Sequence, residues 1–333
     1  MQTRSTPSYA RYRSAIAGIA LLGLIAIACG GATTPSSEVD QVTLDWAYYN
    51  PVSLVLKDQG VLEGVLSAEG ITVNWVQSAG SNKAIEFLNS GSIQFGSTAG
   101  AAALLARVNG SPINAVYSYS RPEWTALVTN GDSDIQSVAD LAGKSVAVTR
   151  GTDPYIFLLR ALADHGLTES DIEVVLLQHA DGKNALVTGQ VDAWAGLDPM
   201  MAQAELEDGA RLFYRAPDLN TWGVLNVDER FAADHPEIVA AVIAAYEQGR
   251  QWALEHPDEL RAILAKAAGL SEDVAAKQLE RTDFSTPGIG QVQHDTILGA
   301  GEALQSSGVI PPEVDVAATV EELLDSTFSE SLG

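Results

Sequence analysis

Hydrophobic and polar positions along the chain follow two periods in turn, and together they predict repeated strand–helix units. Residues 42–46 alternate with the period of two of a half-buried strand, and residues 54–66 follow with helical spacing. The same order continues with strands expected at 72–77, 93–95 and 113–119 and helices at 81–89 and 99–108. Repeated β–α units favour a mostly parallel sheet covered by helices.

A second series begins after the polar turn at residues 130–133. Its expected strands are 145–149, 173–177, 191–195, 212–214 and 222–227, and its expected helices are 138–143, 153–165, 182–188 and 199–207. From Pro236 onward the pattern is helical only, over residues 236–255, 257–268, 271–281, 291–307 and 316–327. The predicted fold class is therefore α/β, with two lobes that each contain a mostly parallel sheet, and a helical C-terminal tail.

Two extended crossings are expected to join the lobes, near residues 125–130 and 222–228. We assign lobe I to residues 41–127 and 226–333, with the C-terminal helices included, and lobe II to residues 128–225. Two crossings between α/β lobes form a hinge, which allows the lobes to close on a ligand.

The N-terminal residues predict export and a lipid anchor. Three arginines precede an apolar run over residues 15–28, which is the layout of a secretory signal peptide. The run ends at Cys29, the single cysteine of the chain, and it resembles the lipobox of bacterial lipoproteins, although Ala26 stands where Leu is commonest. The alternatives are an ordinary signal with an incidental Cys, or a transmembrane anchor, for which the run is shorter than the ~20 residues required.

We therefore expect a signal peptide at residues 1–28, lipidation at Cys29 and a flexible tether over residues 29–40, which are small and polar. This arrangement predicts an extracytoplasmic protein that is anchored by lipid to the cell membrane.

The charge of the chain excludes one broad class of function. Its formal net charge is −24, and without the signal peptide 16 Lys and Arg stand against 43 Asp and Glu, a formal charge of −27. Nucleic-acid binding needs a basic face, so no nucleic-acid partner is expected. The acidity does not exclude an anionic ligand, because backbone N–H groups can hold an anion locally.

A metal or cofactor is not expected either. A single Cys excludes the zinc and iron–sulfur sites that depend on cysteine, and the five His show no ligand spacing. His179 ends a strand-like run and is expected to be structural or exposed. Hydrolase, kinase and dinucleotide-binding motifs are also missing, so no catalytic residue is predicted.

Three turns carry the candidate chemistry, because in each one a strand is followed by small polar residues and then by a helix. They lie at residues 77–83, 96–100 and 149–154. Plain helix capping explains any one of them. Three such turns from both lobes favour a cleft at the carboxyl ends of the strands, where first-turn N–H groups suit an anion.

Aromatic and basic side chains near these turns add further candidates for the site. Tyr48, Tyr49 and Asn50 follow the first strand, and Trp222 begins a crossing, with Trp194 as the weaker alternative because its neighbours suggest a buried strand. Arg121 follows a strand of lobe I and matches a sulfonate or carboxylate in geometry, although a solvated surface position is equally consistent with the sequence.

Four segments together resemble a known family. They are residues 91–96 (GSIQFG), 140–148 (DLAGKSVAV), 189–194 (GQVDAW) and 198–199 (DP). With the lipobox, they are similar to the aliphatic-sulfonate, taurine and nitrate family of ABC-transporter substrate-binding proteins, over about residues 42–256. The resemblance implies the two-lobed periplasmic-binding-protein type II fold, with the anionic head of the ligand between the lobes.

The resemblance also implies which residues bind the ligand. By motif they are Ser78, Gly80, Ser81 and Asn82 after the second strand, Thr98 and Ala99 after the third, Thr152 and Asp153 at a helix start of lobe II, and Asp198. Two departures from the family pattern stand out. Asp153 replaces an Asn and would repel a sulfonate, so it caps its helix or faces a ligand amine, and Leu197 replaces a Trp of the pocket wall.

These observations predict a monomeric binding protein that delivers a small organic anion to an ABC permease, with an alkanesulfonate or taurine as the first choice. Nitrate, bicarbonate, a thiamine-pyrimidine precursor and a riboflavin-like ring remain alternatives within the same class. An enzyme of the related pyrimidine-precursor fold would need a reactive His or Cys at the cleft turns, and a signalling sensor would need a fused output domain. The sequence shows neither feature.

Overall fold

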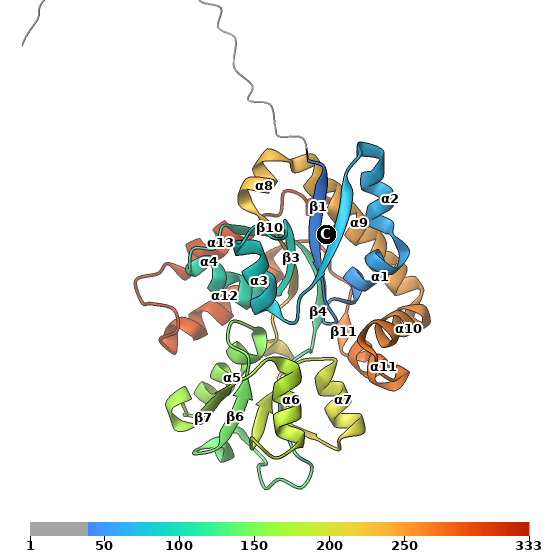
Figure 1. Cartoon of the computed structure of the whole chain (residues 1–333). Helices are drawn as coiled ribbons and strands as arrows, with labels where there is room; N and C mark the ends of the chain where they lie inside the picture. Colours follow the sequence, from blue (N-terminus) through green and yellow to red (C-terminus); the bar gives the residue numbers. More distant parts are fainter. Residues whose placement is uncertain (1–38, 333) are drawn as a thin grey trace, which may run out of the picture. The chain divides into compact units, whose positions relative to one another are not determined.

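Two β-sheets organise the part of the chain described in this computed structural model, residues 39–332 (Figure 1). The first sheet has the strand order β11-β4-β10-β3-β1-β2, with β1 Gln41–Trp46, β2 Thr72–Gln77, β3 Phe95–Ala99, β4 Ile113–Pro122, β10 Gly223–Asp228 and β11 Thr282–Asp283. The second sheet has the order β7-β6-β8-β5-β9, with β5 Leu127–Thr129, β6 Ser145–Val148, β7 Glu173–Leu176, β8 Ala193–Ala195 and β9 Arg211–Tyr214. The predicted signal peptide, Cys29 and most of the predicted tether lie outside the described residues.

Most strands in each sheet run in one direction. β1 pairs in parallel with β2 and β3, and β6 pairs in parallel with β7 and β8. The exceptions are β10 and β5, each the first strand after a crossing, which insert antiparallel between neighbours, and the short edge strand β11. The predicted α/β fold with two mostly parallel sheets is confirmed.

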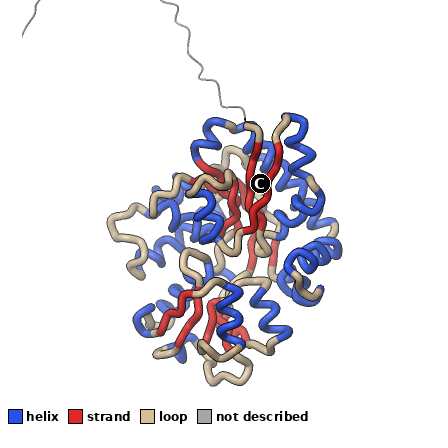
Figure 2. Tube along the Cα trace, in the orientation of Figure 1, coloured by secondary structure: helices blue, strands red, loops and turns tan. Residues whose placement is uncertain are grey.

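Helices cover both faces of each sheet (Figures 1 and 2). On one side of the first sheet lie α1 Pro51–Gln59, α2 Val61–Leu66, α8 Glu229–Asp234, α9 Pro236–Glu255, α10 Pro257–Ala268 and α11 Glu272–Glu280. On its other side lie α3 Ser81–Asn89, α4 Gly100–Val108, α12 Gln291–Ser306 and α13 Val316–Leu323. The second sheet carries α5 Asp153–Asp164, α6 His179–Val187 and α7 Met200–Glu207.

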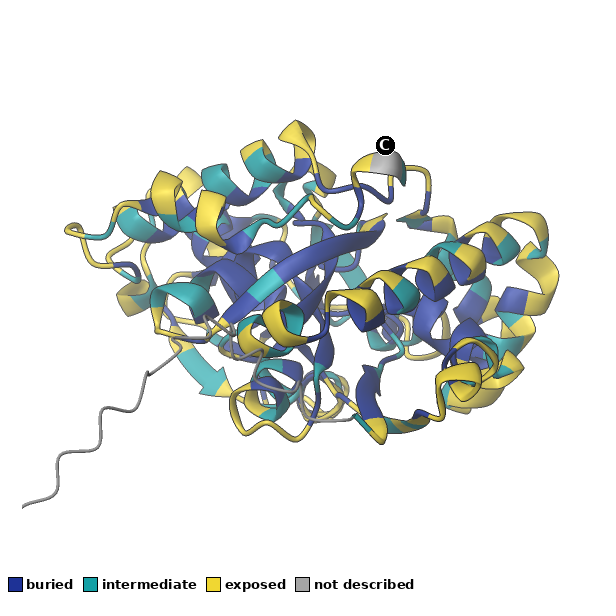
Figure 3. Cartoon of the chain, turned by 90° about the horizontal axis from the view of Figure 1, so that it is seen from above, coloured by how far each residue is buried: buried dark blue, intermediate teal, exposed yellow. Residues whose placement is uncertain are grey.

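The alternation of side chains along the second sheet decides which helix packs on which face. Leu127, Val146 and Val148 point to the cluster that contains α5, whereas Val128 and Ala147 point to the cluster that contains α6 and α7. Successive side chains of a strand face opposite sides, so each strand contributes to two cores. Figure 3 shows the resulting buried strands between helices whose outer faces are exposed.

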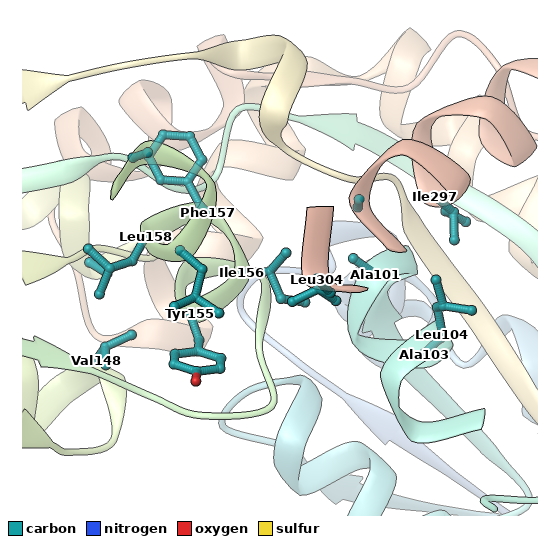
Figure 4. Close-up of a cluster of buried hydrophobic side chains, with 14 of the residues drawn as sticks. Ala101, Ala103, Leu104, Val148, Tyr155, Ile156, Phe157, Leu158, Ile297 and Leu304 are labelled. Carbon is teal, nitrogen blue, oxygen red and sulfur yellow. The ribbon is translucent and has the colours of Figure 1, made fainter. Parts of the chain in front are cut away.

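One apolar cluster joins the two sheets. Ile156 of α5 lies beside Leu304 of α12 and Ala101 of α4, and all three side chains are fully or almost fully buried (Figure 4). Because α5 belongs to the second sheet and α4 and α12 to the first, the two lobes are in contact here. The contact buries apolar side chains of α5 against α4 and α12.

The chain crosses between the sheets at residues 123–126, between β4 and β5, and at residues 215–222, between β9 and β10. Both crossings lie slightly before the predicted positions, because β5 and β10 already belong to the sheets that they enter. The lobe boundaries assigned from the sequence at 127/128 and 225/226 stay a prediction.

Several element predictions were wrong in detail. The helix expected over residues 54–66 is two helices, because Gly60 adopts a left-handed conformation (φ 65°) and ends α1. The strand expected at 93–95 begins at Phe95 and runs to Ala99, and the C-terminal region contains the strand β11 besides its helices. The helix α8 was not anticipated. Within residues 39–332, no helix is both long enough and apolar enough to cross a membrane.

Candidate functional site

A small cavity lies where carboxyl ends of strands from both sheets meet. Its volume is about 10 Å³, which holds about one water molecule. It is lined by Tyr49, Ser81, Trp124, Thr152, Asp153, Pro154 and Leu197. The lining residues follow β1 and β2 in the first sheet and β6 and β8 in the second, with Trp124 on the first crossing. The position agrees with the cleft predicted from the sequence.

Two aromatic rings form one wall of this cavity. The rings of Tyr49 and Trp124 meet edge to face, with centroids 6.0 Å apart and planes at 82°. Their contact gives the cavity an apolar wall even though Leu197 stands at the position where the family pattern has Trp. The aromatic side chain that the family pattern has at position 197 is therefore replaced here by rings from other positions.

The opposite side of the cavity is made by two helix N-termini, those of α3 and α5. No acceptor among the described residues takes the backbone N–H of Ser81 or Asn82 in α3, or of Thr152 or Asp153 at the start of α5. Such first-turn N–H groups favour an anion. Ser81 Oγ accepts from Ala99 N at 3.0 Å, which leaves the hydroxyl hydrogen of Ser81 available to a ligand.

The hydroxyl of Thr152 is placed differently from that of Ser81. It donates to Thr149 O at 2.6 Å, so its proton is used within the turn. Thr152 lines the cavity, but only its backbone N–H and its hydroxyl lone pairs face a ligand as hydrogen-bonding groups. The Thr152 hydroxyl therefore has no hydrogen left to donate to a ligand, and its role as a ligand contact stays a prediction.

Asp153 lines the cavity and joins both crossings. Its Oδ2 accepts from Trp124 Nε1 at 2.8 Å and from Thr221 N at 2.9 Å, and its Oδ1 accepts from the Thr221 hydroxyl at 2.8 Å. Burial raises the pKa of this carboxyl, and the three hydrogen bonds oppose the shift. Of the two roles predicted for Asp153, capping does not occur through a side-chain bond to its own helix. Its carboxylate oxygens are instead held by the crossings.

A buried polar network contacts the hydroxyl of Tyr49. Asp45 Oδ2 accepts from the Ser78 hydroxyl at 2.5 Å, and Asp45 Oδ1 accepts from the N–H and the hydroxyl of Ser97, each at 2.8 Å. The Tyr49 hydroxyl donates to Ser97 O at 2.9 Å. Burial raises the pKa of Asp45 to about 6. Ser78, predicted to bind the ligand, is used in this network and positions the ring of Tyr49 by a 2.9 Å contact.

Next to the cavity, Gly80 of lobe I lies against His179 of lobe II. A Cβ on Gly80 would approach His179 Nε2 to 2.9 Å and Asn82 Oδ1 to 2.8 Å, so only glycine fits here. His179 is buried, which excludes the exposed alternative expected from the sequence and agrees with the structural one, and it packs at the contact between the lobes. Burial lowers the pKa of its imidazole to about 3.

Asp198 lies away from the cavity lining and takes part in a second inter-lobe contact. Its carboxylate is 3.4 Å from Arg281 Nη1, and Arg281 also pairs with Glu205. Both Asp198 and Arg281 are buried. Burial raises the pKa of Asp198 to about 7, although Arg281 acts in the opposite direction. The pair ties the segment after β8 to the end of α11.

The other predicted site residues are not brought to the cavity lining. Asn50 caps α1 and donates to Ser97 Oγ at 2.7 Å, and Thr98 Oγ1 accepts from Asn226 Nδ2 at 2.8 Å. Arg121 is half-exposed, pairs with Asp218 and lies over the ring of Trp222, which is itself buried. Tyr48 and Ala99 also lie outside the lining. Their roles as ligand contacts stay predictions.

The sequence did not indicate Trp124 as a site residue, it indicated His179 only as structural or exposed, and it offered Tyr48 and Tyr49 together as candidates. The alternation of side chains along a strand does not predict which tyrosine faces the cavity, because β1 ends at Trp46 and the chain then turns. In this turn, Asn50 N donates to Ala47 O at 3.0 Å. Trp124 lies in a crossing, where no periodic signal exists. Among residues 39–332, no group of three or more His, Cys, Asp or Glu side chains is arranged to hold a metal ion.

The two sheets, the paired crossings and the inter-lobe cavity define a two-lobed ligand-binding protein of the periplasmic-binding-protein fold. The chain belongs to the family described as NMT1/THI5 like, which matches residues 63–260.

Similar proteins support the resemblance found in the sequence. A protein of Escherichia coli (strain K12) that is named for binding aliphatic sulfonates is 29% identical over 251 residues, which cover 73% of this chain and 77% of the relative. The structure of the alkanesulfonate-binding protein SsuA from Xanthomonas axonopodis pv. citri, bound to MOPS, has a TM-score of 0.78 at 25% identity and covers 85% of this chain and 98% of SsuA. The periplasmic aliphatic sulphonate binding protein SsuA from Escherichia coli has a TM-score of 0.72 at 26% identity, with 83% and 90% covered.

Proposed function

We propose that this protein is the extracytoplasmic substrate-binding lipoprotein of an ABC importer, and that it captures a small organic anion between its lobes. An alkanesulfonate or taurine is the first choice. The main support for this proposal is that the N-termini of α3 and α5, which belong to different lobes, both lie at one cavity. At each N-terminus, backbone N–H groups have no acceptor among the described residues. The similarity to proteins named for binding sulfonates supports this choice.

The charge of the site is consistent with an anion that is held by dipoles. No Lys or Arg is among the residues that line the cavity, so binding depends on helix N-termini and on the Ser81 hydroxyl. The negative charge of Asp153 is the apparent obstacle. Its oxygens already accept three hydrogen bonds from the crossings, which lowers the repulsion that an unpaired carboxylate would exert on the ligand.

Binding through both lobes couples the ligand to closure. A ligand that contacts Ser81 on one lobe and Thr152 on the other binds the closed arrangement better than an open one and shifts the population toward it. We propose that the closed form is the one presented to the permease, that the protein acts as a monomer, and that no reaction is catalysed.

The test is a thermal-shift and calorimetry series with taurine, MOPS, straight-chain alkanesulfonates, nitrate, bicarbonate, a thiamine-pyrimidine precursor and riboflavin. A ligand specific for the folded state at 100 times its Kd stabilises by about 2.7 kcal/mol and raises Tm. We expect sulfonates to do this. A rise of Tm with the heterocycles alone would replace the sulfonate proposal, and no response to any of these anions would refute it.

A matched pair of variants places the anion in the cavity. Ser81→Ala removes a hydroxyl donor to a charged group, which we expect to weaken sulfonate binding by about 1.5–3 kcal/mol. Ser90→Ala, at the exposed other end of α3, is the control and should leave binding unchanged. Equal affinities of the two variants would exclude Ser81 from the site.

A further inference from the structure

The hydrogen bonds of His179 fix which of its nitrogens carries the proton. The Thr149 hydroxyl donates its single hydrogen to Leu177 O at 2.7 Å. Thr149 Oγ1 lies 3.3 Å from His179 Nδ1, so it can only accept from that nitrogen. His179 is therefore the Nδ1–H tautomer, and its Nε2 presents a lone pair. Burial keeps the ring neutral, because it lowers the pKa to about 3.

This lone pair is buried and has no partner. His179 has an exposed fraction of 1%, and no described residue makes a hydrogen bond to its Nε2. Asn82 Oδ1, on the other lobe, is also buried without a partner. An unpaired buried polar atom costs about 1–3 kcal/mol, so a donor that reached both atoms would be stabilised at this contact.

Both orphaned atoms are acceptors, and they flank the same point. Each lies within 3 Å of the position that a Cβ of Gly80 would take, with Asn82 Oδ1 at 2.8 Å and His179 Nε2 at 2.9 Å. With the Asn82 amide oxygen turned toward this point, the group that suits both atoms is a donor; with the amide turned by 180°, its own N–H groups would face the lone pair of His179 Nε2 instead. A plain alkyl chain, a nitrate or a second sulfonate oxygen would leave them unpaired.

Ligand entry exposes this pair. The cavity of about 10 Å³ is too small for a ligand of several heavy atoms, so the lobes must separate slightly to hold one. Gly80 and Asn82 lie at the start of α3, beside the first sheet, and His179 begins α6, beside the second, so a separation of the lobes would open a gap between them. Asn82 adjoins Ser81 of the cavity lining, and its Cβ lies 3.6 Å from where a Cβ of Gly151 would be, in the turn before Thr152. Asn82 and Gly80 are thus next to residues that line the cavity.

We propose that His179 is a specificity-determining residue, and that its Nε2, together with Asn82 Oδ1, accepts hydrogen bonds from an N–H group that the anionic ligand carries. The ligand class is a small anion with an amine or a ring N–H a few bonds from its anionic head. This inference rests on the proposed function, because the anionic head is placed at the helix N-termini.

The experiment compares taurine with 1-propanesulfonate, which replaces the amine by a methyl group. In the unaltered protein we expect taurine to bind at least 10-fold more tightly. His179→Leu should lower taurine affinity by 10-fold or more while propanesulfonate affinity changes less than about 3-fold. His179→Gln, which restores a side-chain acceptor, should recover part of the preference. His165→Gln, at the exposed end of α5, is the control.

The outcomes separate the two proposals. Tight binding of both sulfonates without a preference for the amine refutes the role of His179 and leaves anion capture standing. An equal loss of both ligands in His179→Leu also refutes it, because that result indicates a structural role. Binding of neither sulfonate by the unaltered protein refutes the proposed function itself.

A measurement on the unaltered protein covers the case in which His179→Leu does not fold. With ¹⁵N-labelled histidine, NMR should show the His179 Nε2 resonance of a lone-pair nitrogen without ligand, and an upfield shift on adding taurine. Propanesulfonate should not shift it. A protonated Nε2 without ligand, or the same shift with both sulfonates, overturns the inference.

Discussion

Asp153 offers the sharpest test of how the crossings are held. Asp153→Ala would remove the acceptor for Trp124 Nε1 and for the N–H of Thr221, both of which are buried. Each buried donor that is left without an acceptor destabilises the folded state by about 1–3 kcal/mol. Removal of the buried carboxylate offsets part of this loss, because its desolvation penalty disappears as well. We therefore expect the free energy of unfolding to fall by about 2–4 kcal/mol.

Asp153→Asn separates shape from charge at the same position. An amide oxygen in the place of Oδ2 keeps both N–H bonds, and the amide nitrogen can donate to the Thr221 hydroxyl oxygen, which now lies 2.8 Å from Oδ1. The expected loss is below about 1.5 kcal/mol.

Urea unfolding followed by tryptophan fluorescence measures all these variants, with Asp164→Ala at the exposed end of the same helix as the control. If Asp153→Ala stayed within about 0.5 kcal/mol of Asp164→Ala, the bonds to Trp124 and Thr221 would carry no weight in holding the crossings.

Three further predictions concern closure, pH and anchoring. Arg281→Met leaves the buried carboxylate of Asp198 without its ionic partner from the other lobe. We therefore expect small-angle X-ray scattering to give this variant a larger radius of gyration than the ligand-bound unaltered protein. Identical scattering curves would contradict this. The imidazole of His179 binds a proton near pH 6.5 in the unfolded chain and only near pH 3 in the folded protein. The free energy of unfolding should therefore fall as the pH drops from about 6.5, by up to about 1.4 kcal/mol per pH unit. The fall should be steeper than in His179→Leu. Equal pH slopes in urea unfolding would be inconsistent with a buried neutral ring. Cys29→Ser should release the protein from membranes into the soluble fraction, and a fully membrane-bound variant would rule out lipidation as the anchor.

Local pattern predicted the elements that depend on local physics. The start of α10 at Pro257 and its end before Gly269 follow from a proline in the first turn and a glycine in the left-handed conformation (φ 65°), and both are visible in the sequence. The cleft at the carboxyl ends of the strands followed from the repeated β–α order. Two of the three predicted turns supply helix starts to the cavity, at Ser81 and Thr152.

The third turn shows where such reasoning stops. Thr98 and Ala99 belong to a turn predicted on the same kind of small residues, yet both lie within β3, where β10 pairs beside them. Ala99 N donates to Ser81 Oγ, and Thr98 Oγ1 accepts from Asn226, more than 120 residues away. No local signal distinguishes a turn whose donors face a ligand from one whose donors face a distant strand.

The sequence by itself determined the α/β class, the two-lobed order and the family, because these depend on periodicity and on motifs that lie within short stretches. The tertiary structure alone decided that Trp124 and Tyr49 wall the cavity, that Asp153 holds the crossings and that His179 of one lobe lies against Gly80 of the other. Those contacts join residues from separate segments of the chain. Burial makes every unpaired donor or acceptor costly, so packing over the whole fold decides which polar groups find a partner within the protein. Only the complete arrangement shows which of them are left for a ligand.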